Sequence, residues 1–330
     1  MADKHILYME TTYNYYNVCP DYIEQFKKLG YEVRFFYGQE FSKLSHDQVM
    51  DMFRDCEIAS VCLSPVTREM IEHAPNLKLI CTFGAGTDHI DVATATERGI
   101  PVVNGRGGGA ISVAEMVVSM MMALARNLPE YDYEMRQGIW RSRLAVEVFG
   151  KTAGILGVGA IGSELVRILH DGFHMRILAN DVVPNQQLVE KYGVEYVSQE
   201  ELFRQADFIS IHTPLLPSTR GMVNDEKFDM MKPTAFLINA SRGGVVDEEA
   251  LLRALLDKKI AGAGLDVFEQ EPYVNNCFAE LRNVITTTHC AANTPETVFR
   301  IARMLTEDIE DVLAGKPPRQ NVVNPASLNK

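Results

Sequence analysis

The sequence lacks the cysteine patterns that mark metal sites or disulfide frameworks. Its six cysteines form no CxxC pair, and no cluster of histidine and cysteine has the spacing of metal ligands. Zinc sites and redox-active disulfides need such spacing, so we expect reduced, mostly buried thiols and no bound metal.

Long apolar runs are also lacking. No stretch approaches the ~20 apolar residues of a transmembrane helix, and the longest candidate is the interrupted run 116–125. The opening MADKHILYMET has neither the apolar core nor the small-residue cleavage site of a secretory signal. We therefore expect a cytoplasmic protein with no membrane partner.

Basic residues are fewer than acidic ones: the sequence has 32 Lys and Arg and 44 Asp and Glu, which gives a net charge of −12. Such a charge repels phosphate backbones and anionic lipid, which argues against a nucleic acid partner. With 46% hydrophobic and 23% charged residues, the composition is that of an ordinary globular protein. A chain of 330 residues is too long for one core of ordinary size, so we expect two domains.

Short apolar runs rich in β-branched residues alternate along the chain with amphipathic stretches. This alternation predicts an α/β protein with two doubly wound parallel sheets. The strands expected in the first sheet are 5–10, 32–37, 58–63, 77–82 and 102–104. Those expected in the second sheet are 152–156, 176–180, 207–212, 235–239, 264–267 and 284–287.

Two helices are expected at the borders of these series. Residues 111–126 are rich in Ala, Met and Leu, and Ser112 is the expected N-cap because Glu115 follows three residues later. Near the end of the sequence, Thr294 and Pro295 predict the cap and first position of a helix that runs to about Leu313. We expect this last helix to cross back onto the first domain.

The run GVGAIG at 157–162 follows a strand-like segment and opens a helix-like one. Glycines there allow a tight turn and the close approach of a pyrophosphate to the helix N-terminus, where unpaired N–H groups favour an anion. The spacing alone also fits a purely structural glycine turn. The residues expected to contact a dinucleotide are Gly157, Gly159, Ala160, Ile161 and Gly162.

Asp181 ends the next expected strand, 19 residues after Gly162. A carboxylate at this place can accept hydrogen bonds from the ribose hydroxyls of the adenosine. A turn residue ahead of Pro184 is the alternative, which the combination of strand, glycines, helix and acid disfavours. Val182 and Val183 bring no positive charge for a 2′-phosphate, so the sequence favours NAD over NADP.

Seven segments between Gly84 and Asn293 follow one another in an order typical of one enzyme family. They are GAGTDHID, VVNGRGGGAISVAE, GKTAGILGVGAIG, SIHTPLLPSTRGMVN, LINASRGGVVDEEAL, GLDVFEQEP and NVITTTHCAAN. By these segments the chain resembles the D-isomer-specific 2-hydroxyacid dehydrogenases, which include phosphoglycerate dehydrogenases and hydroxypyruvate reductases. The resemblance implies a Rossmann NAD domain, a flavodoxin-like substrate domain and a cleft between them.

The resemblance also implies the roles of individual residues. Arg242 would bind the substrate, Glu271 would be the carboxylate of a catalytic dyad, and His289 would be the acid/base that also contacts the substrate. The residues that it places against the cofactor are Thr213, Pro214, Ser241 and Asp266.

The positions of the three expected catalytic residues fit these roles. Arg242, Glu271 and His289 each follow or end an expected strand, so all would reach the carboxyl edge of one sheet, where ligands of open α/β folds bind. A guanidinium can grip a carboxylate bidentately and polarise the adjacent keto oxygen. Taken singly, Arg242 could be a surface arginine and His289 a structural histidine, and only their shared edge favours catalysis.

The glycine-rich loop 83–88 closes an expected strand of the first series. Its N–H groups, at Ala85 and Gly86, could hold the substrate carboxylate from the side opposite Arg242. A plain glycine turn is the alternative.

Two segments depart from the family pattern. Arg106 and Gly109 stand where relatives usually have Pro and Asn, and Thr288 replaces the usual Pro before His289, which Cys290-Ala-Ala-Asn293 follows. These changes border the expected substrate pocket rather than the dyad. The chemistry should be kept, while the identity of the 2-hydroxy acid stays open.

Together the sequence predicts an NAD(H)-dependent oxidoreductase that interconverts a D-2-hydroxy acid and its 2-oxo acid by hydride transfer. The expected substrate domain comprises residues 1–104 and 293–330, and the expected NAD domain comprises residues 105–292. The resemblance further implies a homodimer formed through the NAD domains. An NAD(H)-sensing, corepressor-like protein of the same fold is the competing hypothesis, and a formate-oxidising enzyme of related fold would lack a Glu partner for the histidine.

Overall fold

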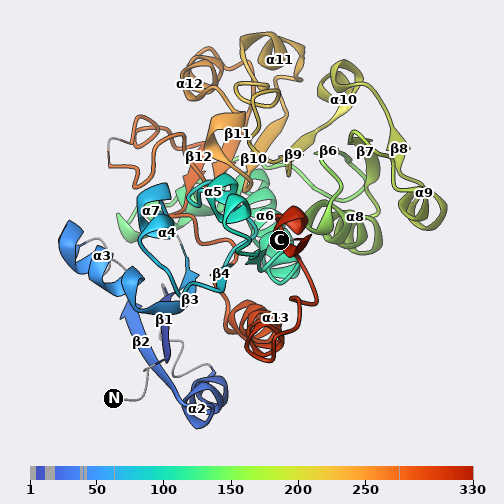
Figure 1. Ribbon diagram of the computed structural model, residues 1–330. Coiled ribbons are helices and arrows are strands. Elements are labelled where there is room, and N and C mark those ends of the chain that lie inside the picture. The colour runs from blue at the N-terminus through green and yellow to red at the C-terminus, as the bar shows by residue number, and fades with distance from the viewer. Residues whose placement is uncertain are drawn as a thin grey trace. The chain divides into compact units, whose positions relative to one another are not determined.

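The computed structural model describes residues 5–11, 19–37, 40, 43–62, 64–274 and 276–329. The chain divides into two compact units, the first made of Met1–Gly109 and Thr294–Lys330 and the second of Ala110–Asn293 (Figure 1). Each unit is built on one sheet.

The border between the units lies five residues later than the predicted border after residue 104. Residues 105–109 remain with the first unit because Gly105 N–H donates to the carbonyls of Thr82 and Gly84, at 3.2 and 2.8 Å. Gly108 also packs so closely on Ile301 that an added Cβ would lie 2.4 Å from its side chain. These contacts tie the glycine turn to the first sheet.

The first unit contains a five-stranded parallel sheet in the order β2-β1-β3-β4-β5 (Figure 1). The strands are β1 (His5–Thr11), β2 (Tyr31–Tyr37), β3 (Cys56–Val61), β4 (Leu79–Thr82) and β5 (Val102–Asn104). This is the flavodoxin-like order of a doubly wound fold.

Helices cover both faces of this sheet. They are α2 (Pro20–Lys28), α3 (His46–Arg54), α4 (Arg68–Glu72), α5 (Val92–Glu97) and α13 (Pro295–Leu313), with the 3₁₀ helix η3 (Pro325–Asn329). Along β4, Leu79 and Cys81 pack in a cluster with α2 and α13, whereas Ile80 packs in a cluster with α3 and α4. The alternation follows from the two-residue period of a strand.

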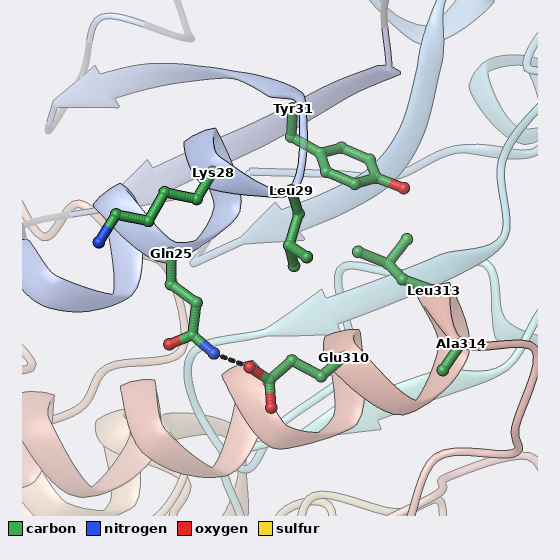
Figure 2. A pocket seen from close by; sticks show the side chains of 7 residues that line it. All are labelled: Gln25, Lys28, Leu29, Tyr31, Glu310, Leu313 and Ala314. Carbon is green, nitrogen blue, oxygen red and sulfur yellow. Dashed lines mark hydrogen bonds between the residues drawn. The ribbon is translucent and has the colours of Figure 1, made fainter.

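Helix α13 begins as the sequence predicts. Thr294 is its N-cap and accepts a hydrogen bond from Thr297 N–H at 3.2 Å, and Pro295 occupies the first turn. The helix belongs to the first unit and contacts α2, β4 and β5, so the predicted return of the chain to the first domain is confirmed. A surface groove of about 530 Å³ lies between α2 and the end of α13, with Leu29, Tyr31 and Leu313 in its wall (Figure 2). No predicted site residue lines this groove.

The second unit contains a seven-stranded parallel sheet in the order β12-β11-β10-β9-β6-β7-β8 (Figure 1). The strands are β6 (Thr152–Leu156), β7 (Arg176–Asn180), β8 (Glu195–Tyr196), β9 (Phe208–Ile211), β10 (Phe236–Asn239), β11 (Gly262–Leu265) and β12 (Val284–Thr286). Strands β6 to β11 repeat the Rossmann order, in which the chain direction across the sheet reverses between β6 and β9. The predicted fold class is confirmed.

The helices of this unit again form two layers. They are α6 (Ala110–Ala125), α7 (Leu128–Arg136), α8 (Ala160–Phe173), α9 (Gln186–Tyr192), α10 (Gln199–Gln205), α11 (Asp225–Met230) and α12 (Glu248–Leu256), with the 3₁₀ helix η2 (Gly243–Val245). Ile177 and Ala179 of β7 face the cluster of α6 and α8, whereas Leu178 faces that of α10, α11 and α12.

The predicted N-cap of α6 is wrong. The helix begins at Ala110, so Ser112 lies within its first turn and is buried rather than flanking the helix. An N-cap residue precedes the first helical residue, so Ser112, two residues inside the helix, cannot have that role. Within the described residues no single helix is long and apolar enough to cross a membrane, although α6 and α7, bent by 62°, together have the length and composition of a broken span.

Candidate active site

The loops that leave the carboxyl ends of β6, β7, β9, β10, β11 and β12 carry the predicted site residues of the second unit. Because the sheet is parallel throughout, these loops share one edge. The register pairs Leu156 of β6 with Ile211 of β9, and Asn239 of β10 with Leu265 of β11, so neighbouring strands end level with one another. An edge of this kind is where open α/β sheets bind ligands.

The glycine turn after β6 is shaped for close backbone approach. Gly157 has a φ of +89°, and a Cβ on it would lie 2.9 Å from the His212 carbonyl. A Cβ on Gly162 would lie 2.2 Å from the Gly157 carbonyl oxygen, so α8 can start this close to β6 only with glycine there. Gly159 is the N-cap of α8, and Ala160 and Ile161 form its first turn, where N–H groups are free of intrahelical partners.

Asp181 closes the same corner from β7. Its carboxylate accepts hydrogen bonds from Val158 N–H in the glycine turn at 2.7 Å and from Val183 N–H at 3.3 Å. The structure therefore brings Asp181 to the glycine motif, as a ribose-binding carboxylate requires. Val182 and Val183 are 96% and 72% exposed and bring no charge to this corner.

The end of β9 contributes unpaired polar atoms beside this turn. Thr213 Oγ1 and His212 Nδ1 are buried and have no hydrogen-bond partner within the described residues. Burial lowers the pKa of His212 to about 4, so this histidine is neutral near pH 7. Buried polar groups are rarely left unpaired in a working protein, so an orphaned hydroxyl next to a glycine cradle fits a bound dinucleotide. Pro214 follows and is exposed.

Arg242 stands in a turn that a buried asparagine holds. Asn239, the last residue of β10, is 1% exposed. Its Oδ1 accepts from Ser241 N–H and Oγ at 3.1 and 2.8 Å, and its Nδ2 donates to the Arg242 carbonyl at 3.0 Å. Arg242 Nη1 donates to the Ser241 carbonyl at 2.8 Å.

The next residue brings the Arg242 turn against the loop that carries Glu271. A Cβ on Gly243 would lie 1.8 Å from the Phe268 carbonyl carbon and 2.3 Å from Glu269 N, so only glycine fits there. The Glu271 loop is closed by Phe268 N–H, which donates to Glu271 Oε1 at 3.0 Å, and by the stacked rings of Phe268 and Tyr273, whose centroids are 4.1 Å apart. The structure thus brings Arg242 and Glu271 to one place.

Glu271 and His289 form a hydrogen-bonded pair. His289 Nδ1 lies 2.7 Å from Glu271 Oε2, and the two side chains are 33% and 32% exposed. Burial alone would raise the pKa of Glu271, but the hydrogen bond from His289, that from Phe268 N–H and the charges of His289 and Arg242 together lower it. Glu271 is therefore anionic around neutral pH.

His289 occupies a strained backbone position that Asp266 supports. Its φ is +53°, in the left-handed region that costs a non-glycine residue about 1–2 kcal/mol. Asp266, 1% exposed, accepts hydrogen bonds through its carboxylate from Thr287 Oγ1, Cys290 N–H and Ala291 N–H, at 2.5, 2.8 and 2.9 Å. Its carbonyl accepts from His289 N–H at 2.8 Å. In this structure Asp266 thus holds the histidine turn, while its predicted contact with a cofactor stays a prediction.

Ala85 and Gly86 belong to the first unit, in the loop that follows β4. The Ala85 carbonyl accepts a hydrogen bond from Asn104 Nδ2 at 2.8 Å, and the Gly84 carbonyl accepts one from Gly105 N–H, so the ends of β4 and β5 are linked. Arg106 is exposed on the neighbouring turn. No group of three or more His, Cys, Asp or Glu side chains in the described part of the chain could hold a metal ion.

Sequence reasoning missed three residues that build this site. Asn239, Gly243 and Glu248 contact the backbone of Arg242, Phe268 and Glu269, the last through a hydrogen bond from Glu269 N–H to the Glu248 carboxylate. Asn239 gave one usable signal, since an Asn that ends a strand commonly bonds the N–H two residues on. The partners of Gly243 and Glu248 lie more than 20 residues away, and no local pattern points to them.

Comparisons with known proteins identify the family of the chain. A family model described as "D-isomer specific 2-hydroxyacid dehydrogenase, NAD binding domain" matches residues 118–291. The D-3-phosphoglycerate dehydrogenase of Methanocaldococcus jannaschii is 40% identical over 285 residues, which are 85% of this chain and 54% of that protein. The glyoxylate reductase of Korarchaeum cryptofilum is 39% identical over 284 residues, which are 84% of this chain and 85% of that protein.

A solved structure gives the same likeness in three dimensions. The D-lactate dehydrogenase of Aquifex aeolicus, complexed with NAD and lactic acid, has a TM-score of 0.82 at 29% identity, with 98% of each chain covered. The chain spans about half the length of the D-3-phosphoglycerate dehydrogenases that it matches. By the family model and by its likeness to the glyoxylate reductase, the chain belongs to the D-isomer-specific 2-hydroxyacid dehydrogenase family.

Proposed function

We propose that this protein is an NAD(H)-dependent dehydrogenase that interconverts a D-2-hydroxy acid and its 2-oxo acid. The observation that carries the proposal is the 2.7 Å pair of His289 and Glu271, set next to the Arg242 turn on the edge that also bears the glycine turn. A protein that only sensed NAD(H) would need the glycine turn and Asp181 but not this acid–base pair. A formate-oxidising enzyme would need no carboxylate beside the histidine.

Each residue of the site has a task in the reduction of a 2-oxo acid. Arg242 would bind the substrate carboxylate with its planar fork and stabilise negative charge that develops on the keto oxygen. His289, as imidazolium, would donate a proton from Nε2 to that oxygen, since its Nδ1 faces Glu271. Glu271 would hold the ring in place through its contact with Nδ1. NADH, when bound, supplies the hydride that goes to the carbonyl carbon.

The cofactor would be held by residues at the ends of β6, β7 and β9. The glycine turn with Ala160 and Ile161 would receive the pyrophosphate, and Asp181 would accept hydrogen bonds from the adenosine ribose. Thr213, with its unpaired hydroxyl, would contact the cofactor together with Pro214, Ser241 and Asp266.

The direct test of this function is NADH oxidation with a panel of 2-oxo acids. The panel should include glyoxylate, pyruvate, hydroxypyruvate and 3-phosphohydroxypyruvate, since relatives named for glyoxylate, lactate and phosphoglycerate are similar to this chain. We expect turnover of at least one member, with the D isomer as product wherever the hydroxy acid is chiral. NADH binding without turnover of any of them would favour the sensing protein instead.

The first unit would be the substrate domain. Ala85 and Gly86 would offer backbone N–H groups to the substrate carboxylate. Arg106, exposed on the turn after β5, would be available to a second anionic group of the substrate. Arg68 is a weaker candidate because it already lies 3.1 to 4.0 Å from carboxylate oxygens of Glu72, Glu97 and Asp91.

We expect Glu271→Gln to lower kcat/KM for reduction of the 2-oxo acid. The amide keeps the shape of the side chain but loses the negative charge that lies beside the imidazole during proton transfer. The measurement is kcat/KM for the best oxo acid in both proteins at one fixed pH. An unchanged kcat/KM would exclude Glu271 as the partner of the histidine.

We expect NADH to be strongly preferred over NADPH. The Asp181 carboxylate sits at the glycine turn and would repel a 2′-phosphate, and the two residues after it are uncharged valines. Comparison of kcat/KM for the two cofactors tests this expectation. Equal or better use of NADPH would remove Asp181 from the proposed ribose site.

The assembly and location follow as proposals. Segment 128–149 of the second unit exposes several large apolar side chains, and such a surface is typical of a protein–protein interface. The exposed side chains are Leu128, Tyr133, Met135, Ile139, Trp140, Leu144 and Phe149. This supports a homodimer formed through the NAD domains, which sedimentation of the protein would measure. The six cysteines carry thiols and form no disulfide among the described residues, which supports a reducing, cytoplasmic location.

A further inference from the structure

Asn239 uses both ends of its amide on the two residues that lead to the Arg242 side chain. Its Oδ1 accepts from Ser241 N–H and Oγ, and its Nδ2 donates to the Arg242 carbonyl, at 2.8 to 3.1 Å. The side chain is almost completely buried at the carboxyl end of β10, a strand held between β9 and β11. The amide therefore joins a rigid strand end to a turn that has no strand pairing of its own.

The same turn is held from its other side by the Glu271 loop. Gly243 lies directly against the backbone of Phe268 and Glu269, where even a methyl group would not fit. Arg242 itself is extended, with φ −144° and ψ 135°, and its Nη1 returns to the Ser241 carbonyl at 2.8 Å. The backbone that carries the Arg242 side chain is thus held both by Asn239 and by the contact of Gly243 with the Glu271 loop.

We propose that Asn239 is a positioning residue that sets the orientation of Arg242 toward the substrate carboxylate and Glu271. This inference rests on the proposed function of Arg242. The side chain must accept from Ser241 and donate to the Arg242 carbonyl, and an amide of this length can do both because it combines an acceptor with a donor. Aspartate keeps the acceptor but loses the donor to the Arg242 carbonyl, and alanine loses both.

A loss of this brace should act through substrate binding and the transition state rather than through the cofactor turn. A misplacement of about 1 Å in a positioned group can cost about 100-fold in rate. For Asn239→Ala we expect kcat/KM for the 2-oxo acid to fall about 10- to 100-fold, with KM raised and kcat lowered as for a change at Arg242 itself. NADH binding, measured by fluorescence titration, should change less than about threefold, because Ser241 is only one of the proposed cofactor contacts and the glycine turn and Asp181 are untouched.

A double-mutant cycle separates positioning from general damage. The variants are Asn239→Ala, Arg242→Lys and the double variant, each assayed with the same oxo acid. If Asn239 acts through Arg242, its replacement in the Arg242→Lys background should cost less than about threefold. If the fold-losses of kcat/KM in the two single variants multiply to give that of the double variant, the proposal is overturned.

Asn324→Ala is the matched control. Asn324 is also buried and also uses both ends of its amide, accepting from Val102 N–H at 2.7 Å and donating to the Ile100 carbonyl at 3.0 Å, but it lies in the first unit near the chain end. We expect a lowered Tm in this variant with KM unchanged. If Asn324→Ala raises KM as much as Asn239→Ala, the effect is loss of stability and Asn239 has no special part. Asn239→Asp replaces the alanine variant if the latter fails to fold.

Crystal structures of the Asn239 variant and of the wild type give a readout that does not depend on turnover. We expect the Ser241–Arg242 backbone and the guanidinium to shift by about 1 Å or more, with the His289–Glu271 pair in place. An Arg242 that keeps its orientation would refute the positioning role even in an active enzyme. A wild type that reduces no 2-oxo acid would refute the proposed function, and the same crystals would still decide whether Asn239 orients Arg242.

Discussion

Replacing His289 with alanine should lower kcat by about 10²- to 10⁴-fold in both directions, because the reaction loses its positioned acid and base. NADH binding should be kept, since the glycine turn, Asp181 and Thr213 are untouched by the change. Steady-state kinetics with the best oxo acid and hydroxy acid, together with fluorescence titration of NADH, measure the two effects separately.

His170 provides a control for this experiment. It is a surface histidine of α8 whose Nδ1 lies 2.8 Å from Asp171 Oδ1, so it matches His289 in having a carboxylate partner. His170→Ala should leave kcat and KM as in the wild type. If His289→Ala retained near-normal turnover, the histidine–glutamate pair would be structural and the proposed chemistry wrong.

Changing Arg242 to lysine should lower kcat/KM by about 10²- to 10³-fold, which is the usual cost of removing a positioned donor from developing negative charge. The point charge of an ammonium cannot reproduce the two parallel hydrogen bonds of a guanidinium to a carboxylate. The KM for the oxo acid should rise and kcat should fall, while the Kd of NADH stays close to that of the wild type.

Arg253 is the matched control for this substitution. It lies on α12 of the same unit and grips Asp225 through Nε and Nη2, at 3.2 and 2.7 Å, on the surface. Solvent screens an exposed pair of this kind, so Arg253→Lys should change neither stability nor kinetics appreciably. A wild-type kcat/KM in Arg242→Lys would remove Arg242 from the substrate site.

The strand pattern could be read from the sequence because both sheets are parallel and buried on both faces. Their strands appear as short apolar runs between turn residues, and the expected ranges 102–104, 152–156 and 176–180 coincide with β5, β6 and β7. The predicted strand ends are wrong where a buried apolar residue takes no part in the hydrogen bonding of the sheet. Leu77 is buried, but its N–H donates to the Ala74 carbonyl in the preceding turn, so β4 begins only at Leu79.

Strand β11 shows the opposite error. It was expected at 264–267 and lies at Gly262–Leu265. Its glycines carry no apolar side chain to reveal the strand, yet a Cβ on Gly262 would lie 2.4 Å from the Asn283 carbonyl oxygen, and one on Gly264 would lie 3.1 Å from Met120. Close packing by neighbours more than 20 residues away in the sequence requires glycine at these positions. The local pattern of apolar residues gives no sign of this packing.

The fold class and the family could be predicted from the sequence, and candidates for the acid–base site could be named, because the motifs lie at strand ends and parallel strands bring their ends to one edge. The side chains that hold that site together are visible only in three dimensions. The Asp266 carboxylate accepts hydrogen bonds from the turn of His289, and the Asn239 amide donates one to the turn of Arg242. Such bonds depend on the direction in which each side chain leaves its strand end and on which neighbouring loop it meets, and the periodicity of the chain specifies neither.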